Sequence, residues 1–232
     1  MYYFFYDYWY LILCVPPLIL ALFAQFKVRY TYKKYSQVMS SSGLDGAGAA
    51  RTVLSFNDVP PIAIGQTAGE LTDHYDPRTN SIALSQNVYG SHSVAALGIA
   101  AHEAGHAVQY AVGYGPMKVR GKILPVASIG SQAGIWLAVL GSVFAALRPI
   151  AYVGVGLYIA FVLFELITLP VEINASNRAV KALEACGVMA GGELAGAKKV
   201  LRAAALTYVA ALASSVGMLL RLLIMLNGRD RD

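Results

Sequence analysis

The sequence predicts a mainly α-helical membrane protein, with about four transmembrane helices and one small cytoplasmic unit of mixed helices and strands. Of its 232 residues, 57% are hydrophobic and only 13% are charged, whereas soluble domains are about 25% charged. Four nearly uncharged stretches also reach the roughly 20 residues that a helix needs to cross the hydrocarbon core of a bilayer. The length fits one membrane-embedded domain that covers residues 1–232.

The hydropathy pattern places four spans along the chain. An aromatic-rich stretch, residues 2–10, leads into the first span and is typical of a membrane interface, not of a cleavable signal peptide. Pro16 and Pro17 predict a kink in that span. Gly130 and Gly134 give the second span a face of small residues, a pattern that can favour helix association. The predicted spans are residues 8–26, 123–147, 149–169 and 203–220.

The basic residues predict the orientation of the chain. Residues 27–122 hold nine of the 18 Lys and Arg residues, and residues 170–202 hold five. By the positive-inside rule both polar segments are cytoplasmic, while the N-terminus and the tail, residues 229–232, are outside. The net charge of +5 is therefore explained without nucleic acid, which we do not expect as a partner. Two cysteines are too few for a disulfide framework or a cysteine-rich metal site.

The first polar segment predicts a small folded unit. We expect a helix over residues 44–56 with a serine as N-cap, followed by a β-hairpin around the turn sequence at residues 76–80. A longer helix should run from about residue 93 to residue 112 and end at Gly113. The expected strands cover residues 62–64, 71–75 and 81–85.

The long helix contains the sequence AHEAGH at residues 101–106, which matches the pattern H-E-x-x-H. His102 and His106 share one helix face, so both imidazoles can reach one Zn²⁺ ion, and Glu103 can take a proton from a metal-bound water. The same five residues also occur by chance, on helices with two ordinary histidines. Here the surrounding helix is apolar, so two histidines and a glutamate would be costly to bury without a metal.

Catalytic zinc takes three protein ligands and leaves one position open. Glu172, in the sequence LPVEINAS at residues 169–176, is the best candidate for the third ligand of a single zinc ion per chain. Pro170 suits the first turn of a new helix, and Ser176 lies one turn after Glu172, where it could orient a ligand. Without the upstream motif, Glu172 would be interpreted as a solvated carboxylate at the membrane interface. Glu165 and Glu70 are the alternatives.

Several blocks of the sequence, in this order, resemble the YugP-type bacterial zinc membrane metallopeptidases over nearly the whole chain. They are KKYS at 33–36, SGL at 42–44, DHYDPR at 73–78, AHEAGHA at 101–107, LPVE with NAS at 169–176 and ALTYVA at 205–210. The family is distantly similar to HtpX and the CAAX-prenyl endopeptidases, whose third ligand is a glutamate in the motif E-x-x-x-D. Glu172 matches that glutamate, and Ser176 stands where the motif has aspartate.

The resemblance implies a zincin-like cytoplasmic unit of the gluzincin type in a multi-pass protein of the bacterial inner or plasma membrane. The implied activity is hydrolysis of membrane or membrane-proximal polypeptides on the cytoplasmic side, so the partners are a polypeptide substrate and the lipid bilayer. In peptidases of this plan a strand before the zinc helix pairs with the substrate backbone. The hairpin strand Ser81, Ile82, Ala83, Leu84 and Ser85 could serve, although the preceding block also fits a simple turn.

Four further residues are candidates to stabilise the transition state, because a developing oxyanion needs a hydrogen bond or a positive charge. Spacing does not choose among them: they are His74, Tyr75, Arg178 and Tyr208. His92 is expected in a loop. Glu165, inside the third span, is an ionisable group in a membrane helix, either functional or protonated and directed to the interface.

Three other functions compete. A site-2-type intramembrane protease would place H-E-x-x-H inside a span, but the motif LDG, at residues 44–46, lies upstream of the histidines instead of downstream. The peptidase module of the AAA-type membrane proteases would need an ATPase from another subunit, because this chain has no phosphate-binding loop. A zinc-stabilised membrane scaffold without turnover would have no need of Glu103. No protein partner or oligomeric state follows from the sequence.

Overall fold

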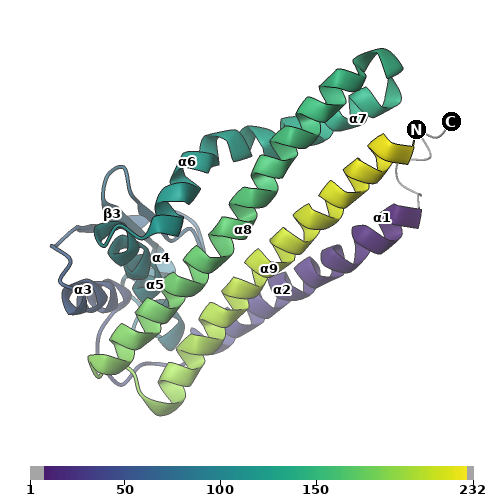
Figure 1. The fold of residues 1–232 in the computed structure, drawn as a ribbon. Coiled ribbons are helices and arrows are strands. Elements are labelled where there is room, and N and C mark those ends of the chain that lie inside the picture. The colour runs from purple at the N-terminus through teal and green to yellow at the C-terminus, as the bar shows by residue number, and fades with distance from the viewer. Residues whose placement is uncertain (1–7, 229–232) are drawn as a thin grey trace. The chain divides into compact units, whose positions relative to one another are not determined.

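The structure, a computed structural model, describes residues 8–228. Most of these residues are helical, and a single three-stranded sheet accompanies the helices (Figure 1). Four helical segments are long and apolar enough to cross a membrane: Tyr8–Tyr35, Gly115–Val143, Arg148–Ala185 and Gly191–Asn227. The predicted fold class, a mainly α-helical protein with four apolar helices and a small sheet, is therefore confirmed. The cytoplasmic placement of the mixed unit stays a prediction. The predictions for residues 2–7 and for the tail at 229–232 fall outside the described residues.

The chain divides into two compact units. The first, called the span unit, contains Met1–Gln25, Lys118–Leu169 and Leu206–Asp232. The second, called the polar unit, contains Phe26–Met117 and Pro170–Ala205. All candidate site residues except Glu165 and Tyr208 belong to the polar unit. A single domain made of both units stays a prediction.

In the span unit the first two apolar segments are interrupted helices. Helices α1 (Tyr8–Leu13) and α2 (Val15–Tyr35) meet at Cys14, two residues before the first of the two prolines that predict a kink. The second segment has a π-helical turn in its middle, and such turns arise where one extra residue is accommodated in a helix. Its parts are α6 (Gly115–Ile129), η2 (Gly130–Gly134), α7 (Ile135–Val143) and the short 3₁₀ turn η3 (Ala145–Leu147).

The small-residue face of the second span packs within the chain. A Cβ atom added at Gly130 would overlap the backbone carbonyl of Leu157, and one added at Gly134 would lie 2.9 Å from the carbonyl oxygen of Gly154. Both partners belong to α8 (Arg148–Ala185). Glycine therefore lets two helix backbones approach closely here, and this contact accounts for the pattern without a second chain.

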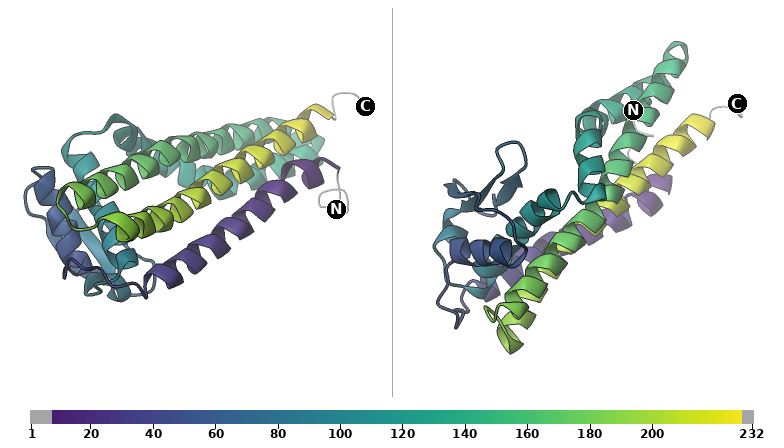
Figure 2. Two further views of the ribbon diagram at one scale, coloured as in Figure 1. Left: turned by 90° about the horizontal axis from the view of Figure 1, so that it is seen from below. Right: turned by 60° about the vertical axis from the view of Figure 1, so that its left-hand side comes forward.

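The last two helices are longer than the predicted spans. Helix α8 and helix α9 (Gly191–Gly228) each run without interruption, as Figure 2 shows. The expectation that a new helix starts at Pro170 is wrong, because α8 continues through it. A proline removes one backbone hydrogen bond and bends a helix, but the hydrogen bonds on either side keep α8 continuous.

Helix α3 (Gly46–Phe56), which lies wholly in the polar unit, begins about where the sequence predicts it, but its N-cap differs. The cap is Asp45, whose carboxylate accepts a hydrogen bond of 2.7 Å from the backbone N–H of Gly48. The predicted serine cap is therefore wrong. Asp is as good an N-cap as Ser, and its charge also interacts favourably with the helix dipole.

The sheet has the strand order β1-β3-β2. Strands β2 (His74–Asp76) and β3 (Ser81–Ser85) form the predicted antiparallel hairpin, and β1 (Ala63–Thr67) pairs with β3 in parallel. The prediction that Ser81–Ser85 offers a free edge to a substrate is therefore wrong. β3 is the central strand: β1 pairs with all five of its residues on one side, and β2 pairs with Ser81, Ile82 and Ala83 on the other.

Helix α5 (Val94–Ala111) is the centre of the polar unit. Its N-cap Ser93 accepts a hydrogen bond of 3.2 Å from the N–H of Ala96, and the chain leaves the helix through Gly113, which has a positive φ of 67°. These bounds confirm the predicted helix. Most of α5 is buried against α3, the sheet and the short helix α4 (Gln86–Tyr89), so any polar side chain on it must find a partner inside the protein.

Candidate metal centre

Three potential ligands from two helices meet in the polar unit. His102 and His106 lie on α5, and Glu172 lies on α8; their ligand atoms are all within 4.8 Å of one another. Glu172 Oε2 is 3.2 Å from His102 Nε2 and 3.5 Å from His106 Nε2. In a tetrahedral zinc site with bonds of about 2.1 Å, neighbouring ligand atoms lie about 3.4 Å apart. The donor set and its spacing therefore fit one zinc ion with a position left for water.

The centre is largely shielded from solvent, and the His102 side chain, 15% exposed, is its most open ligand. Glu172 is 4% exposed, and His106 and Glu103 are each 8% exposed. Burial by itself would lower the pKa of His106, but the hydrogen bond to Glu172 and the charges of Glu103 and Glu172 outweigh it and raise that pKa above its usual value. An environment that favours an imidazolium cation also favours a bound metal cation, because the same carboxylates stabilise both.

Close packing of α5 against α8 brings the ligands together. A Cβ atom built at Gly105, between the two histidines, would lie 2.5 Å from the backbone oxygen of Ala175, which follows Glu172 on α8. No side chain fits at this position without movement of a backbone. Gly105 thus allows the two ligand-bearing helices to approach each other at the metal centre.

Each histidine has a second polar partner on its Nδ1 atom. Ser176 Oγ lies 3.0 Å from His102 Nδ1, so it occupies the position proposed for it from its spacing on α8. Gln109 Oε1 lies 3.0 Å from His106 Nδ1. With Nδ1 engaged in this way, each imidazole presents Nε2 toward Glu172.

Gln109 is the residue that the sequence analysis missed. Its amide nitrogen donates hydrogen bonds of 2.9 Å to the backbone oxygen of Val171 and of 2.9 Å to Asn174 Oδ1. Arg178 Nε donates a hydrogen bond of 2.8 Å to the same Asn174 oxygen. The available signal was a polar residue three positions after His106 on a helix that is otherwise apolar, which requires a buried partner.

The remaining candidates are placed as follows. His74 is exposed in β2, with Nδ1 2.8 Å from the backbone oxygen of Thr72. Tyr75 is buried and its hydroxyl donates a hydrogen bond of 2.7 Å to Asn80; burial raises its pKa to about 12. His92 lies in a loop, as predicted. The residues in the span unit are Glu165, half-buried on α8, and Tyr208, on α9.

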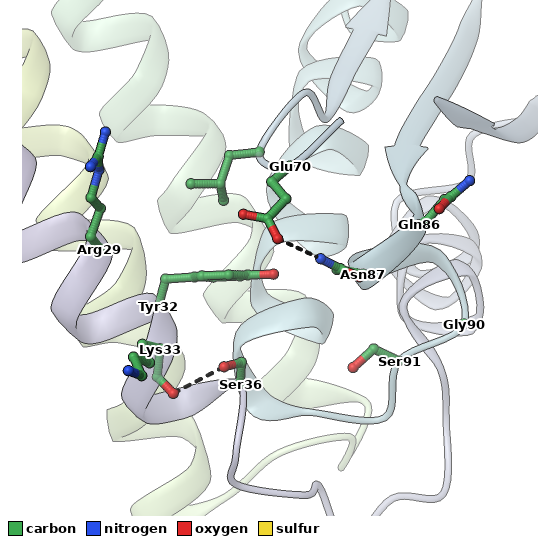
Figure 3. A pocket seen from close by; sticks show the side chains of 10 residues that line it. Arg29, Tyr32, Lys33, Ser36, Glu70, Gln86, Asn87, Gly90 and Ser91 are labelled. Atoms are coloured by element: carbon green, nitrogen blue, oxygen red, sulfur yellow. Dashed lines mark hydrogen bonds between the residues drawn. The ribbon is translucent and has the colours of Figure 1, made fainter. Parts of the chain in front are cut away.

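A separate hollow of about 1090 Å³ lies in the polar unit and shares no lining residue with the metal centre. It is lined by the end of α2, by the loop after β1 and by α4, and Figure 3 shows Arg29 and Glu70 among its side chains. Glu70 accepts a hydrogen bond of 3.1 Å from Asn87. Within the described part of the chain, Glu70 is not among the residues grouped at the metal centre, so it is not an alternative third ligand there.

The metal centre is of the metallopeptidase type, because two histidines one turn apart on a buried helix meet a glutamate from a second helix. The four apolar helices make the class that of a membrane protein. The family described as "Putative neutral zinc metallopeptidase" matches residues 10–227, and the chain belongs to this family. The chain is 43% identical over 224 residues to the "Putative membrane protease YugP" of Bacillus subtilis (strain 168). The aligned region covers 96% of this chain and 99% of that protein. No solved structure matches the chain.

Proposed function

We propose that this protein is a zinc-dependent endopeptidase that cleaves membrane or membrane-proximal polypeptides on the cytoplasmic side of a bacterial cell membrane. The observation that carries the proposal is the triad of His102, His106 and Glu172, spaced as zinc ligands beside the buried carboxylate of Glu103. Zinc would be held one per chain by this triad, with both units acting together as one peptidase domain.

Zinc at this centre would supply a water of lowered pKa, roughly 7, and would polarise the scissile carbonyl group. Glu103 then acts as the general base. Its carboxylate accepts a proton from the water while the water oxygen attacks the carbonyl carbon, and it passes this proton to the amide nitrogen as the C–N bond breaks. Glu103 is 8% exposed, so its carboxylate is largely shielded from bulk water.

The proposed orientation of the polar unit in the membrane rests on the distribution of Lys and Arg residues. The segments that make up most of the polar unit carry fourteen of the 18 Lys and Arg residues, nine in residues 27–122 and five in residues 170–202. We place these segments in the cytoplasm for this reason. The substrate would then be a polypeptide that reaches the metal centre from the cytoplasmic face of the bilayer.

A substrate segment in extended conformation could add to the sheet only at β1 or β2, because β3 is enclosed between them. Strand β2 packs beside the metal-bearing helix, where the ring of Tyr75 lies 5.9 Å from the ring of Tyr110 on α5. Main-chain hydrogen bonds at a free strand edge give affinity without demanding a particular side chain. This mode suits an enzyme that reads an unfolded segment of a larger protein.

The site-2 alternative finds no support in the helices. The four described segments long and apolar enough to cross a membrane do not include α5, the helix that carries both histidines. Instead, α5 packs against α3 and the sheet in the polar unit. The scaffold alternative differs from the peptidase only in the role of Glu103.

Glu103→Gln tests the proposal directly. Glutamine keeps the size and the hydrogen bonds of Glu103 but cannot accept a proton at neutral pH, so cleavage should fall by about 10²–10⁴-fold while zinc content stays near one per chain. Glu172→Ala should instead lose zinc. Full activity in Glu103→Gln would refute the assigned base, and full zinc content in Glu172→Ala would remove that residue from the centre. Comparing membrane proteomes of cells with wild type and with Glu103→Gln would reveal substrates.

A further inference from the structure

We propose that Gln109 is a positioning residue, which fixes the tautomer of His106 so that the Nε2 lone pair faces the metal. This inference rests on the proposed function, since it concerns the same centre. It assigns a role to a residue outside the three ligands and the general base, and it follows from the directions of four hydrogen bonds.

The side chain of Gln109 is 0% exposed, and both ends of its amide are engaged. Its Oε1 lies 3.0 Å from His106 Nδ1. Its Nε2 lies 2.9 Å from the backbone oxygen of Val171 and 2.9 Å from Asn174 Oδ1. The amide therefore links a ligand on α5 to residues that flank Glu172 on α8.

The chemistry of these partners leaves only one orientation for the Gln109 amide. The carbonyl of Val171 can only accept a hydrogen bond, so it must face the NH₂ group. The guanidinium of Arg178 can only donate; since its Nε lies 2.8 Å from Asn174, that side chain must present its oxygen there. The same oxygen then accepts from Gln109. Two independent contacts thus require the NH₂ group to face α8 and the oxygen to face His106.

The consequence for His106 is direct. The Oε1 atom of Gln109 has no hydrogen to give, so His106 Nδ1 must be the donor in their contact. A neutral imidazole with its hydrogen on Nδ1 carries a lone pair on Nε2. His106 Nε2 lies 3.5 Å from Glu172 Oε2, so both atoms could bind the same metal ion. The order Arg178, Asn174, Gln109, His106 is a line of hydrogen bonds that ends on the ligand atom.

His102 provides the contrast within the same centre. Its Nδ1 lies 3.0 Å from a serine hydroxyl, Ser176 Oγ, which can either donate or accept a hydrogen bond. That contact holds the ring but does not select the tautomer. Only on the His106 side does the neighbouring side chain fix the hydrogen on Nδ1, which leaves Nε2 as the atom that can bind a metal.

The test compares zinc affinity, by chelator competition on the purified full chain, for wild type, Gln109→Met and Gln109→Glu. Methionine fills a similar volume without an acceptor for His106 Nδ1–H, so zinc should bind about 10- to 100-fold more weakly. A carboxylate at 109 still accepts from Nδ1–H but cannot donate to Val171 or Asn174. Gln109→Glu should therefore bind zinc more tightly than Gln109→Met, which a purely structural bridge between the helices would not predict.

A second measurement reads the tautomer itself. Nitrogen NMR of the zinc-loaded, ¹⁵N-histidine-labelled chain should show a protonated Nδ1 on His106, with slow hydrogen exchange in wild type and fast exchange in Gln109→Met. Ser176→Ala is the matched control, because it should change the His102 signals and leave those of His106 in place.

The inference is overturned if Gln109→Met binds zinc as tightly as wild type, or if Gln109→Glu binds no better than Gln109→Met. A wild-type chain that takes up no zinc would give a different result: it would refute the proposed function, and the role of Gln109 with it. The two failures are thus separated by the behaviour of the wild type.

Discussion

Replacing Gly105 with alanine should dismantle the metal centre by adding a single methyl group. The new Cβ would lie 2.5 Å from the backbone oxygen of Ala175, about 0.9 Å less than the 3.4 Å at which ordinary contacts begin. The obstacle is a backbone atom, so no side chain can rotate away. Either α5 or α8 must move by nearly 1 Å, and each carries part of the ligand set.

The size of the effect follows from this displacement. Zinc sites tolerate deviations of roughly 0.2 Å in ligand distances, so a shift of nearly 1 Å between Glu172 and the two histidines should abolish tight binding. Overpacking a buried contact costs about 1–3 kcal/mol. In the metal-free protein the higher helix propensity of alanine offsets about 1 kcal/mol of that cost. We therefore expect Gly105→Ala to fold, with reduced stability, and to bind zinc at least about 10-fold more weakly.

Gly98→Ala is the matched control. Gly98 lies on the same helix, two turns before Gly105, and gains the same helix propensity. Its added Cβ would meet the side-chain Cβ of Ala197 at 3.3 Å, a contact that a small shift relieves. Gly98→Ala should keep wild-type zinc affinity and wild-type or higher thermal stability.

The assay is chelator competition for zinc together with thermal unfolding, with and without metal, for the two variants and wild type. In wild type and Gly98→Ala, zinc should raise the unfolding temperature; in Gly105→Ala that increase should be small or absent. Equal zinc affinity in all three proteins would show that the close approach of α5 and α8 is not needed, and the reasoning from Gly105 would be refuted.

Cys186, exposed at the end of α8, reports the orientation of the polar unit. In cells that express a Cys14→Ser variant, a membrane-impermeant thiol reagent should label Cys186 only after permeabilisation; labelling of intact cells would place the metal centre outside. Asp73 reports a pH effect: burial, opposed by hydrogen bonds from Ser85, raises its pKa above the usual 3.8. Its contribution to stability is full below that value and is lost as pH rises through the folded-state pKa. The unfolding temperature of Asp73→Asn should therefore improve relative to wild type between pH 4 and 7, and a difference independent of pH would contradict this.

The elements that the sequence predicted well are those set by local patterns. The helix that carries His102 and His106 has a serine cap at one end and a glycine at the other, and both signals lie within a few residues of the boundary they fix. The hairpin of β2 and β3 is equally local, because a turn sequence joins its strands. The four apolar segments stand out by composition alone.

The errors concern choices that involve distant residues. The position of β1 beside β3 depends on parallel pairing between Ala63–Thr67 and Ser81–Ser85, and no turn sequence encodes it. Sequence reasoning therefore treated Ser81–Ser85 as an edge. Pro170 was interpreted from its own helix preference, whereas the helix on both sides of it is long enough to continue through the defect.

Gln109 and Gly105 were overlooked for a related reason, and together they show what determines the centre. Each is meaningful only once α8 is placed against α5: Gly105 because Ala175 lies 2.5 Å from its missing methyl group, Gln109 because Val171 and Asn174 accept its amide hydrogens at 2.9 Å. These contacts lie on both sides of Glu172 on α8. A slip of one residue between the helices would break all of them and carry the glutamate away from the histidines. A short motif on α5 therefore supplies two of the three ligands, His102 and His106. The position of Glu172 beside them depends on the register between α5 and α8.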